Sequence, residues 1–218
     1  MPSPGVSNWL KHPLAEALLR FSMLPSTFMH PARQVAAGTS LNLPALHRHR
    51  SAELIKLHDL DPVLELDDPA LPLALLPDDH FNRMALLLGA ALNAPHIRRT
   101  IARDDVAQLR SQIGEEGLGM ARGSSATALA GMPVVPDWEA ARARLLCILC
   151  GTAVFGQVFD GAAPPVSVRA NLRIDPQADG MRVALSAAGL TPPRALEVAR
   201  DLLATLEPEW LSSFATAP

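Results

Sequence analysis

The sequence contains no tyrosine, and aromatic residues make up only 4% of its 218 residues. Proteins that bind single-stranded nucleic acid stack the bases on aromatic side chains, so this composition argues against that class. The formal net charge is −3, whereas binding to phosphate requires clustered positive charge. We therefore expect neither nucleic acid nor an anionic membrane surface among its partners.

Cysteine is scarce as well. Cys147 and Cys150 are the only two, and they stand in the apolar stretch RARLLCILCG. Two cysteines in a chain of this length make no disulfide framework, which favours the cytoplasm. A CxxC pair is found in redox sites and in halves of zinc sites, but no second Cys or His pair lies nearby. We interpret the pair as two small core residues.

The chain also lacks an apolar run as long as the ~20 residues that cross a bilayer. The longest uncharged run covers residues 145–158, and the N-terminal apolar stretch is interrupted by Glu16. That stretch therefore has no signal-peptide core. We expect a soluble, unprocessed protein in the cytoplasm.

Apolar residues are abundant, at 49%, and 20 prolines separate the stretches that contain them. Within residues 78–92 the spacing of Phe81, Met84, Ala85 and Leu88 predicts a helix with a continuous apolar face. Leu86 and Leu87 widen that face, which indicates a buried central helix. The uncharged run 145–158 predicts a second buried helix packed against the first.

Two helices are expected between residues 95 and 114. One unbroken helix would place Asp105 on the apolar stripe of Ile97, Ile101, Leu109 and Ile113, where a lone carboxylate is costly. We therefore predict a break near Arg103, a cap at Asp104 and a helix end at Gly114.

The predicted fold is mainly α, a compact multi-helix domain with a small β-hairpin near residues 166–185. The hairpin prediction depends on Val166, Val168, Ala170 and Leu172, which alternate with polar residues. A hairpin alone is marginally stable, so it is expected to lie on the helices. We expect a single domain over residues 1–218, with an N-terminal subregion 1–60 packed on a core of 71–214.

Two basic runs are candidate binding sites. The first contains His47, Arg48 and Arg50, and the second contains Arg98, Arg99 and Arg103. Either run is suited to acidic groups on a partner, and either is also compatible with a solvated helix face or, for the second run, with internal ion pairs to Asp104 and Asp105.

A metal-dependent enzyme is an alternative hypothesis. His58, Asp59, Asp61 and His80 offer metal-ligating side chains, and Asp59 and Asp61 have the DxD spacing of some sugar transferases. No nucleotide-binding βαβ pattern surrounds this pair, and oxygen-ligand sites need several convergent groups. His30 is expected to hydrogen-bond a local carbonyl.

Three stretches together resemble one family. They cover residues 19–30, residues 71–99, where Ile97-Arg98-Arg99 closely follows the leucine-rich helix, and residues 145–169, which end in Val166-Ser167-Val168-Arg169. In this order they resemble the SctK/YscK-type accessory protein of bacterial type III secretion injectisomes. The family often has a polar residue and a proline where this chain has Asp104-Asp105.

The resemblance implies a non-catalytic cytoplasmic adaptor without a cofactor. It would link the pod, or C-ring-like, protein of the sorting platform to the cytoplasmic domain of the inner-membrane ring protein, close to the membrane but not inserted in it. The candidate partner-binding residues are Arg98, Arg99, Arg103, His47, Arg48 and Arg50. A secretion chaperone is a further alternative, although such chaperones carry a substantial sheet.

Overall fold

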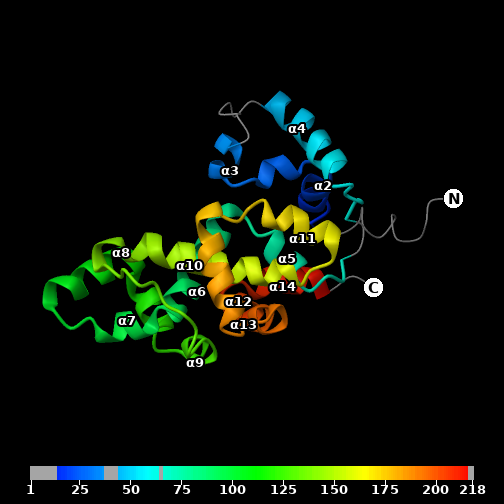
Figure 1. Cartoon of the computed structure of the whole chain (residues 1–218). Coiled ribbons are helices and arrows are strands. Elements are labelled where there is room, and N and C mark those ends of the chain that lie inside the picture. The colour runs from blue at the N-terminus through cyan, green and yellow to red at the C-terminus, as the bar shows by residue number, and fades with distance from the viewer. Residues whose placement is uncertain (1–13, 37–43, 64–65, 216–218) are drawn as a thin grey trace. The chain divides into compact units, whose positions relative to one another are not determined.

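Helices make up the regular structure of the chain. The computed structural model describes residues 14–36, 44–63 and 66–215, and no strand occurs among them (Figure 1). The prediction of a mainly α fold is confirmed. The chain forms two units, of which the first comprises Met1–Leu76, Phe159–Pro176 and Leu203–Pro218, and the second Pro77–Val158 and Gln177–Leu202. The expected N-terminal subregion 1–60 is part of the first unit, together with these later segments.

Prolines begin most helices of the first unit. A proline suits the first position of a helix because its missing amide hydrogen is not needed there. The helices of this unit are α2 (Ala15–Met23), η1 (Pro25–Phe28), α3 (Pro31–Ala36), α4 (Pro44–Leu57), α5 (Leu71–Ala74), α11 (Pro164–Asn171) and α14 (Pro208–Ala215). Within the unit, η1 contacts α2, α4 and α11, and α5 contacts α11 and α14. The N-terminal apolar stretch that Glu16 interrupts forms α2.

The prediction of a hairpin near residues 166–185 is wrong. Helix α11, the short helix η3 (Pro176–Ala178) and helix α12 (Asp179–Ala187) occupy this stretch. Val166, Arg169, Ala170 and Arg173 are all buried, and their spacing is that of one helix face. The strand prediction assigned both arginines to water, and this assignment concealed the helical pattern.

Backbone carbonyls explain why two arginines are stable in this core. Arg169 donates from Nε and Nη2 to the Ser22 carbonyl at 3.2 and 3.0 Å, and from Nη1 to the Pro165 carbonyl at 2.8 Å. Burial lowers the pKa of Arg169, and nearby Asp61 opposes that shift. Arg173 donates to the Ala74 carbonyl at 2.8 Å. Each buried cation therefore has partners, as buried polar groups require.

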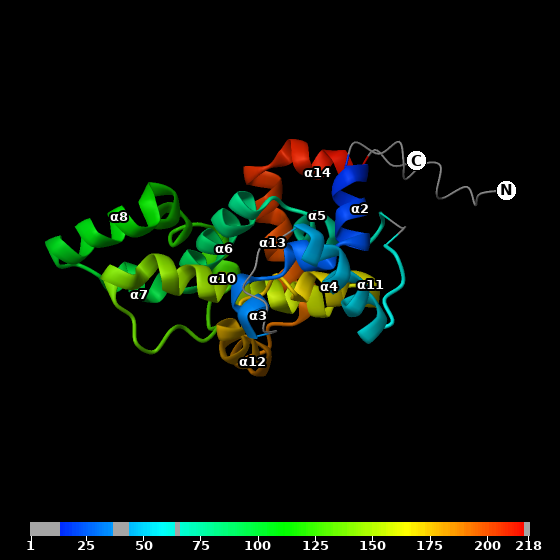
Figure 2. The same cartoon turned by 90° about the horizontal axis from the view of Figure 1, so that it is seen from above.

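The second unit contains the two predicted buried helices. Its elements are α6 (Asp78–Leu92), α7 (Ala94–Arg99), α8 (Arg103–Met120), α9 (Ser124–Ala128), η2 (Ala140–Arg142), α10 (Ala143–Asp160), α12 and α13 (Pro192–Leu206). Helices α6 and α10 lie side by side in both views (Figures 1 and 2). The rings of Phe81 and Phe155 stack with centroids 4.5 Å apart. The predicted packing of these two helices is confirmed.

Two glycines bring the backbones of α6 and α10 into direct contact. A Cβ atom added at Gly89 would lie 1.8 Å from the Cys147 carbonyl oxygen, and one added at Gly151 would lie 1.8 Å from the Ala85 carbonyl oxygen. Each helix thus supplies the glycine that admits the backbone of the other. No side chain fits at either position.

The predicted break near Arg103 is confirmed, because α7 ends at Arg99 and α8 begins at Arg103. Asp104 does not cap α8 through its side chain, since Ala102 occupies the cap position and no side-chain cap bond is present. Asp104 and Asp105 instead lie in the first turn, where the helix dipole favours negative charge. The predicted helix end at Gly114 is confirmed, since Gly114 has non-helical backbone with φ of 67° and ψ of 178°, and two helical segments of Arg103–Met120 meet there at a kink.

Among the described residues, one helix, Ala140–Asp160, is long and apolar enough to cross a bilayer. Of its most apolar window, 72% is buried inside the protein. The core helix of a soluble protein meets the same criteria of length and composition.

Candidate interaction surfaces

The basic run of α4 divides between the interior and the surface. His47 Nδ1 lies 3.1 Å from Ser26 Oγ, which also donates to the His47 carbonyl at 2.9 Å. Arg50 is only 9% exposed. Arg48 is exposed and has no hydrogen-bond or ion-pair partner among residues 14–36, 44–63 and 66–215. Of the three predicted contact residues in this run, only Arg48 is exposed without a polar partner in the described part of the chain.

The second basic run divides in a similar way. Arg98 donates from Nε to the Ala121 carbonyl at 2.7 Å, so its side chain closes the end of α8. Arg99 and Arg103 are exposed, and neither has a polar partner in the described part of the chain. The internal pairs with Asp104 and Asp105 considered above are therefore not formed.

An exposed isoleucine lies between these two arginines. Ile101, in the short connection from α7 to α8, is 88% exposed, more than any other exposed large hydrophobic side chain of the described residues. We call Arg99, Ile101 and Arg103 the α7–α8 surface. An apolar residue within a charged rim is the usual composition of a protein-binding patch. Only an unbroken helix would have placed Ile101 on the apolar stripe of Ile97 and Leu109, and the break between α7 and α8 leaves it in the connection.

A polar pocket of about 370 Å³ adjoins the α7–α8 surface along the chain. Thr100 and Asp105 line it from the α7–α8 side, and Trp138 and Glu139 line it from the segment before η2. The Trp138 indole stacks on the His96 ring, with centroids 5.4 Å apart and planes 5° apart. Carboxylates in the pocket and cations beside it give this part of the second unit mixed charge.

The residues of the metal hypothesis do not come together. His58, Asp59 and Asp61 are exposed around the end of α4, and His80 Nε2 lies 3.7 Å from Asp79 Oδ2 in the first turn of α6. No group of three or more His, Cys, Asp or Glu side chains is arranged for a metal ion within the described ranges. These residues lie at and after the end of α4 and in the first turn of α6, and they form no common site.

The two cysteines are buried free thiols in α10, which confirms the prediction that they are core residues. Burial, with a smaller contribution from Cys150, raises the pKa of Cys147 well above its usual value. Burial also raises the pKa of Cys150 to about 11, and a hydrogen bond with the buried Asn93 partly opposes that rise. Both thiols are protonated at neutral pH and are poor nucleophiles.

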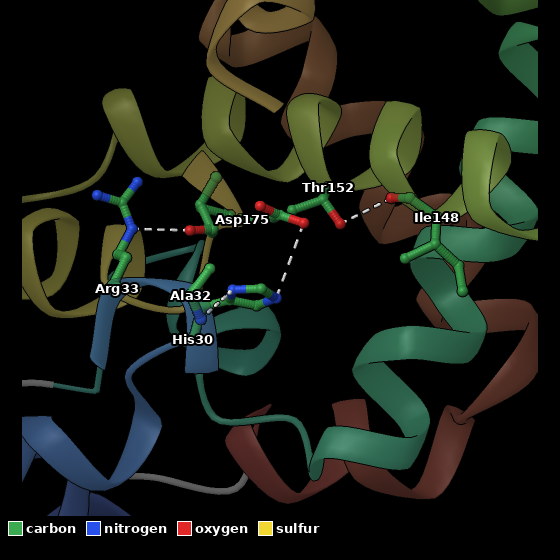
Figure 3. Close-up of polar contacts among 7 residues, drawn as sticks. His30, Ala32, Arg33, Ile148, Thr152 and Asp175 are labelled. Carbon is green, nitrogen blue, oxygen red and sulfur yellow. Dashed lines mark hydrogen bonds and ion pairs between the residues drawn. The ribbon is translucent and has the colours of Figure 1, made fainter. Parts of the chain in front are cut away.

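His30 has a different environment from the one predicted. Its ring accepts a hydrogen bond at Nδ1 from the Ala32 amide at 3.3 Å, and its Nε2 lies 3.9 Å from Asp175 Oδ2 (Figure 3). Neither partner of the ring is a carbonyl oxygen. The neighbouring Arg33 donates to the Ile174 carbonyl at 2.8 Å (Figure 3). The Arg33 hydrogen bond joins α3 to the segment after α11.

Comparisons with protein-family models, curated protein sequences and solved structures gave no match. The fold and the surfaces described above are therefore the structural basis for a functional proposal.

Proposed function

We propose that this protein is a non-catalytic adaptor of the type III secretion sorting platform. It would link the pod protein to the cytoplasmic domain of the inner-membrane ring protein, at the cytoplasmic face of the inner membrane. The likeness of residues 19–30, 71–99 and 145–169 to the SctK/YscK-type proteins supports the choice of system. The observation that carries a binding role is the α7–α8 surface, where an isoleucine that is 88% exposed lies between two arginines that have no polar partner among the described residues.

This surface is well suited to an adaptor. Burying an exposed isoleucine against a partner would contribute about 1.5–3 kcal/mol. Arg99 and Arg103 have no polar partner within the described structure that a binding protein would first have to displace. Arginine is enriched in binding hot spots because its planar group makes several directed hydrogen bonds to carboxylates. An acidic, partly apolar patch on a partner complements this set.

The chemistry of the described residues supports a binding role over the two alternatives. The enzyme hypothesis depended on His58, Asp59, Asp61 and His80, which do not converge. The buried, protonated thiols of Cys147 and Cys150 offer no accessible nucleophile. The chaperone alternative implied a sheet, and residues 14–36, 44–63 and 66–215 contain no strand.

A pull-down assay with the purified full chain tests the proposal. The baits are the pod protein and the cytoplasmic domain of the ring protein, each presented separately. We expect the chain to bind both. The variant Arg99→Glu/Ile101→Asp/Arg103→Glu should weaken binding to one of them at least tenfold, a loss of about 1.4 kcal/mol.

The matched control is Arg122→Glu/Val183→Asp/Arg200→Glu. It makes the same change in charge and replaces another exposed apolar residue, since Val183 is 70% exposed. It should bind as the unchanged chain does. Folded chain that binds neither bait would reject the adaptor role in this system, and full binding by the first variant would reject the α7–α8 surface.

A further inference from the structure

A groove of about 610 Å³ lies within the first unit. One wall comes from residues 62–63 and 68–69, before α5, and the other from the turn that leads from α10 into α11. Val63 and Val166 line it while being only 4% and 3% exposed, so they form an apolar floor. This volume lies within the range of about 300–1,000 Å³ typical of ligand sites.

Hydrogen bonds hold the groove in shape. Asp68 accepts from the Ala70 amide at 2.8 Å with one carboxylate oxygen and from the Ala163 amide at 2.7 Å with the other. The same carboxylate therefore joins both walls. The Val63 amide donates to Ser22 Oγ at 3.0 Å and fastens the floor to α2. A groove fixed in this way loses little conformational entropy when it is filled.

The polar groups of the groove are mainly acceptors. Pro62, Pro69 and Pro165 line it, and proline has no amide hydrogen to donate. Both amides that face Asp68 are already used by its carboxylate. Carbonyl and carboxylate oxygens are thus the groups that the groove offers to a ligand.

Negative charge surrounds the groove. Asp61, Asp67 and Asp160 are exposed, and each directly precedes a lining residue on a different stretch of the chain. Residues 59–63, 66–71 and 160–168 contain no lysine or arginine. The first arginine after them, Arg169, is 1% exposed, donates to carbonyls in the interior and lies near Asp61, whose charge it partly offsets. These segments themselves supply acidic side chains and no lysine or arginine.

We infer that this groove is a docking site for a segment of a partner protein in which an apolar side chain is flanked by arginine or lysine. The apolar floor selects the central side chain, and the acidic, acceptor-rich rim selects cations that donate hydrogen bonds. Anionic segments are rejected by the same charges. The inference deepens the adaptor proposal, on which it rests for the claim that the chain binds protein segments.

The test uses two peptides with the same apolar centre, acetyl-Arg-Leu-Leu-Arg-amide and acetyl-Glu-Leu-Leu-Glu-amide. Each is titrated into the ¹⁵N-labelled full chain, and the amide signals of Val63, Ala163 and Val166 are followed by NMR. The arginine peptide should shift these signals in a saturable way. The glutamate peptide should bind at least tenfold more weakly, and added salt should weaken the arginine peptide because exposed charges are screened.

Two variants locate the binding. Asp61→Asn/Asp67→Asn/Asp160→Asn removes the rim charge and should weaken the arginine peptide at least fivefold. The matched control, Asp104→Asn/Asp105→Asn/Asp137→Asn, changes the net charge equally and should bind within twofold of the unchanged chain. Ala163→Phe narrows the groove but keeps the amide that donates to Asp68, and it should abolish the shifts.

Several outcomes overturn the inference: equal binding of the two peptides, shifts away from the groove, no shift at millimolar peptide, or full binding by the rim variant. The pull-down assay separates this failure from that of the adaptor proposal. Peptide binding without capture by either bait would reject the secretion system and leave the groove in place. Capture by a bait without peptide binding would reject the groove as a docking site and leave the adaptor proposal in place.

Discussion

The Gly89→Ala substitution is the sharpest test of how α6 and α10 pack. The added Cβ would lie 1.8 Å from the Cys147 carbonyl oxygen, whereas carbon and oxygen in close contact lie about 3.3 Å apart. The clashing atom belongs to the backbone of a buried helix, so no side-chain rotation relieves it. The two helices must separate by more than an ångström.

The magnitude follows from two opposing terms. Alanine favours a helix over glycine by about 1 kcal/mol. Overpacking a core costs about 1–3 kcal/mol and more where the backbone must move, and separating α6 from α10 also loosens the Phe81–Phe155 stack. We expect a net loss of about 3 kcal/mol or more. That loss is a large share of the 5–15 kcal/mol by which domains are typically stable.

The assay is guanidinium unfolding followed by circular dichroism, with Gly180→Ala as the matched control. A Cβ at Gly180, in α12, has no atom within 4 Å, so this variant should gain about 0.4–1 kcal/mol. Gly151→Ala should resemble Gly89→Ala, and the double variant should lose less than the sum because the helices separate only once. Equal stability of Gly89→Ala and Gly180→Ala would refute the reasoning.

Two further predictions concern buried polar groups. Arg169→Met keeps most of the side-chain volume but leaves the Ser22 carbonyl without its donors, and thermal unfolding should show a loss of about 1–3 kcal/mol. Arg200→Met, at an exposed position, should stay within about 0.5 kcal/mol, and a similar loss in both would contradict the role of Arg169. Burial raises the pKa of the Cys150 thiol in the folded chain to about 11, above its ordinary value of 9.0. The free energy of unfolding should therefore fall as pH rises through that interval, because the unfolded chain loses this proton first. Urea unfolding at a series of pH values measures that slope, which should be shallower in Cys150→Ala; an unchanged slope would contradict the pKa shift.

The buried helices of the second unit were predictable because hydrophobic spacing is a local signal. Residues 81–92 and 145–158 are apolar over several turns, and no competing pattern obscures them. The close approach of the α6 and α10 backbones at Gly89 and Gly151 has no such local signal in the sequence. A glycine in a helix is recognisable as a contact point only when the backbone opposite it is known.

The error at residues 166–173 has a different cause. Arg169 and Arg173 are buried because the carbonyls of Ser22, Pro165 and Ala74 accept their hydrogen bonds. Those carbonyls belong partly to distant segments, so the sequence pattern alone made the arginines look exposed. The same limit applies to the candidate site. Arg98 bonds to the Ala121 carbonyl, whereas Arg99 and Arg103 have no polar partner among the described residues, and the local sequence does not distinguish the three.

The order of segments in the first unit has a consequence for synthesis on the ribosome. Trp210 in α14 donates from Nε1 to the Pro72 carbonyl of α5, at 2.8 Å, so a segment made late completes one made early. Residues up to 202 supply everything the second unit contains, whereas the first still awaits Leu203 and the residues beyond it. A nascent chain can thus finish its second unit while the first remains open to chaperones.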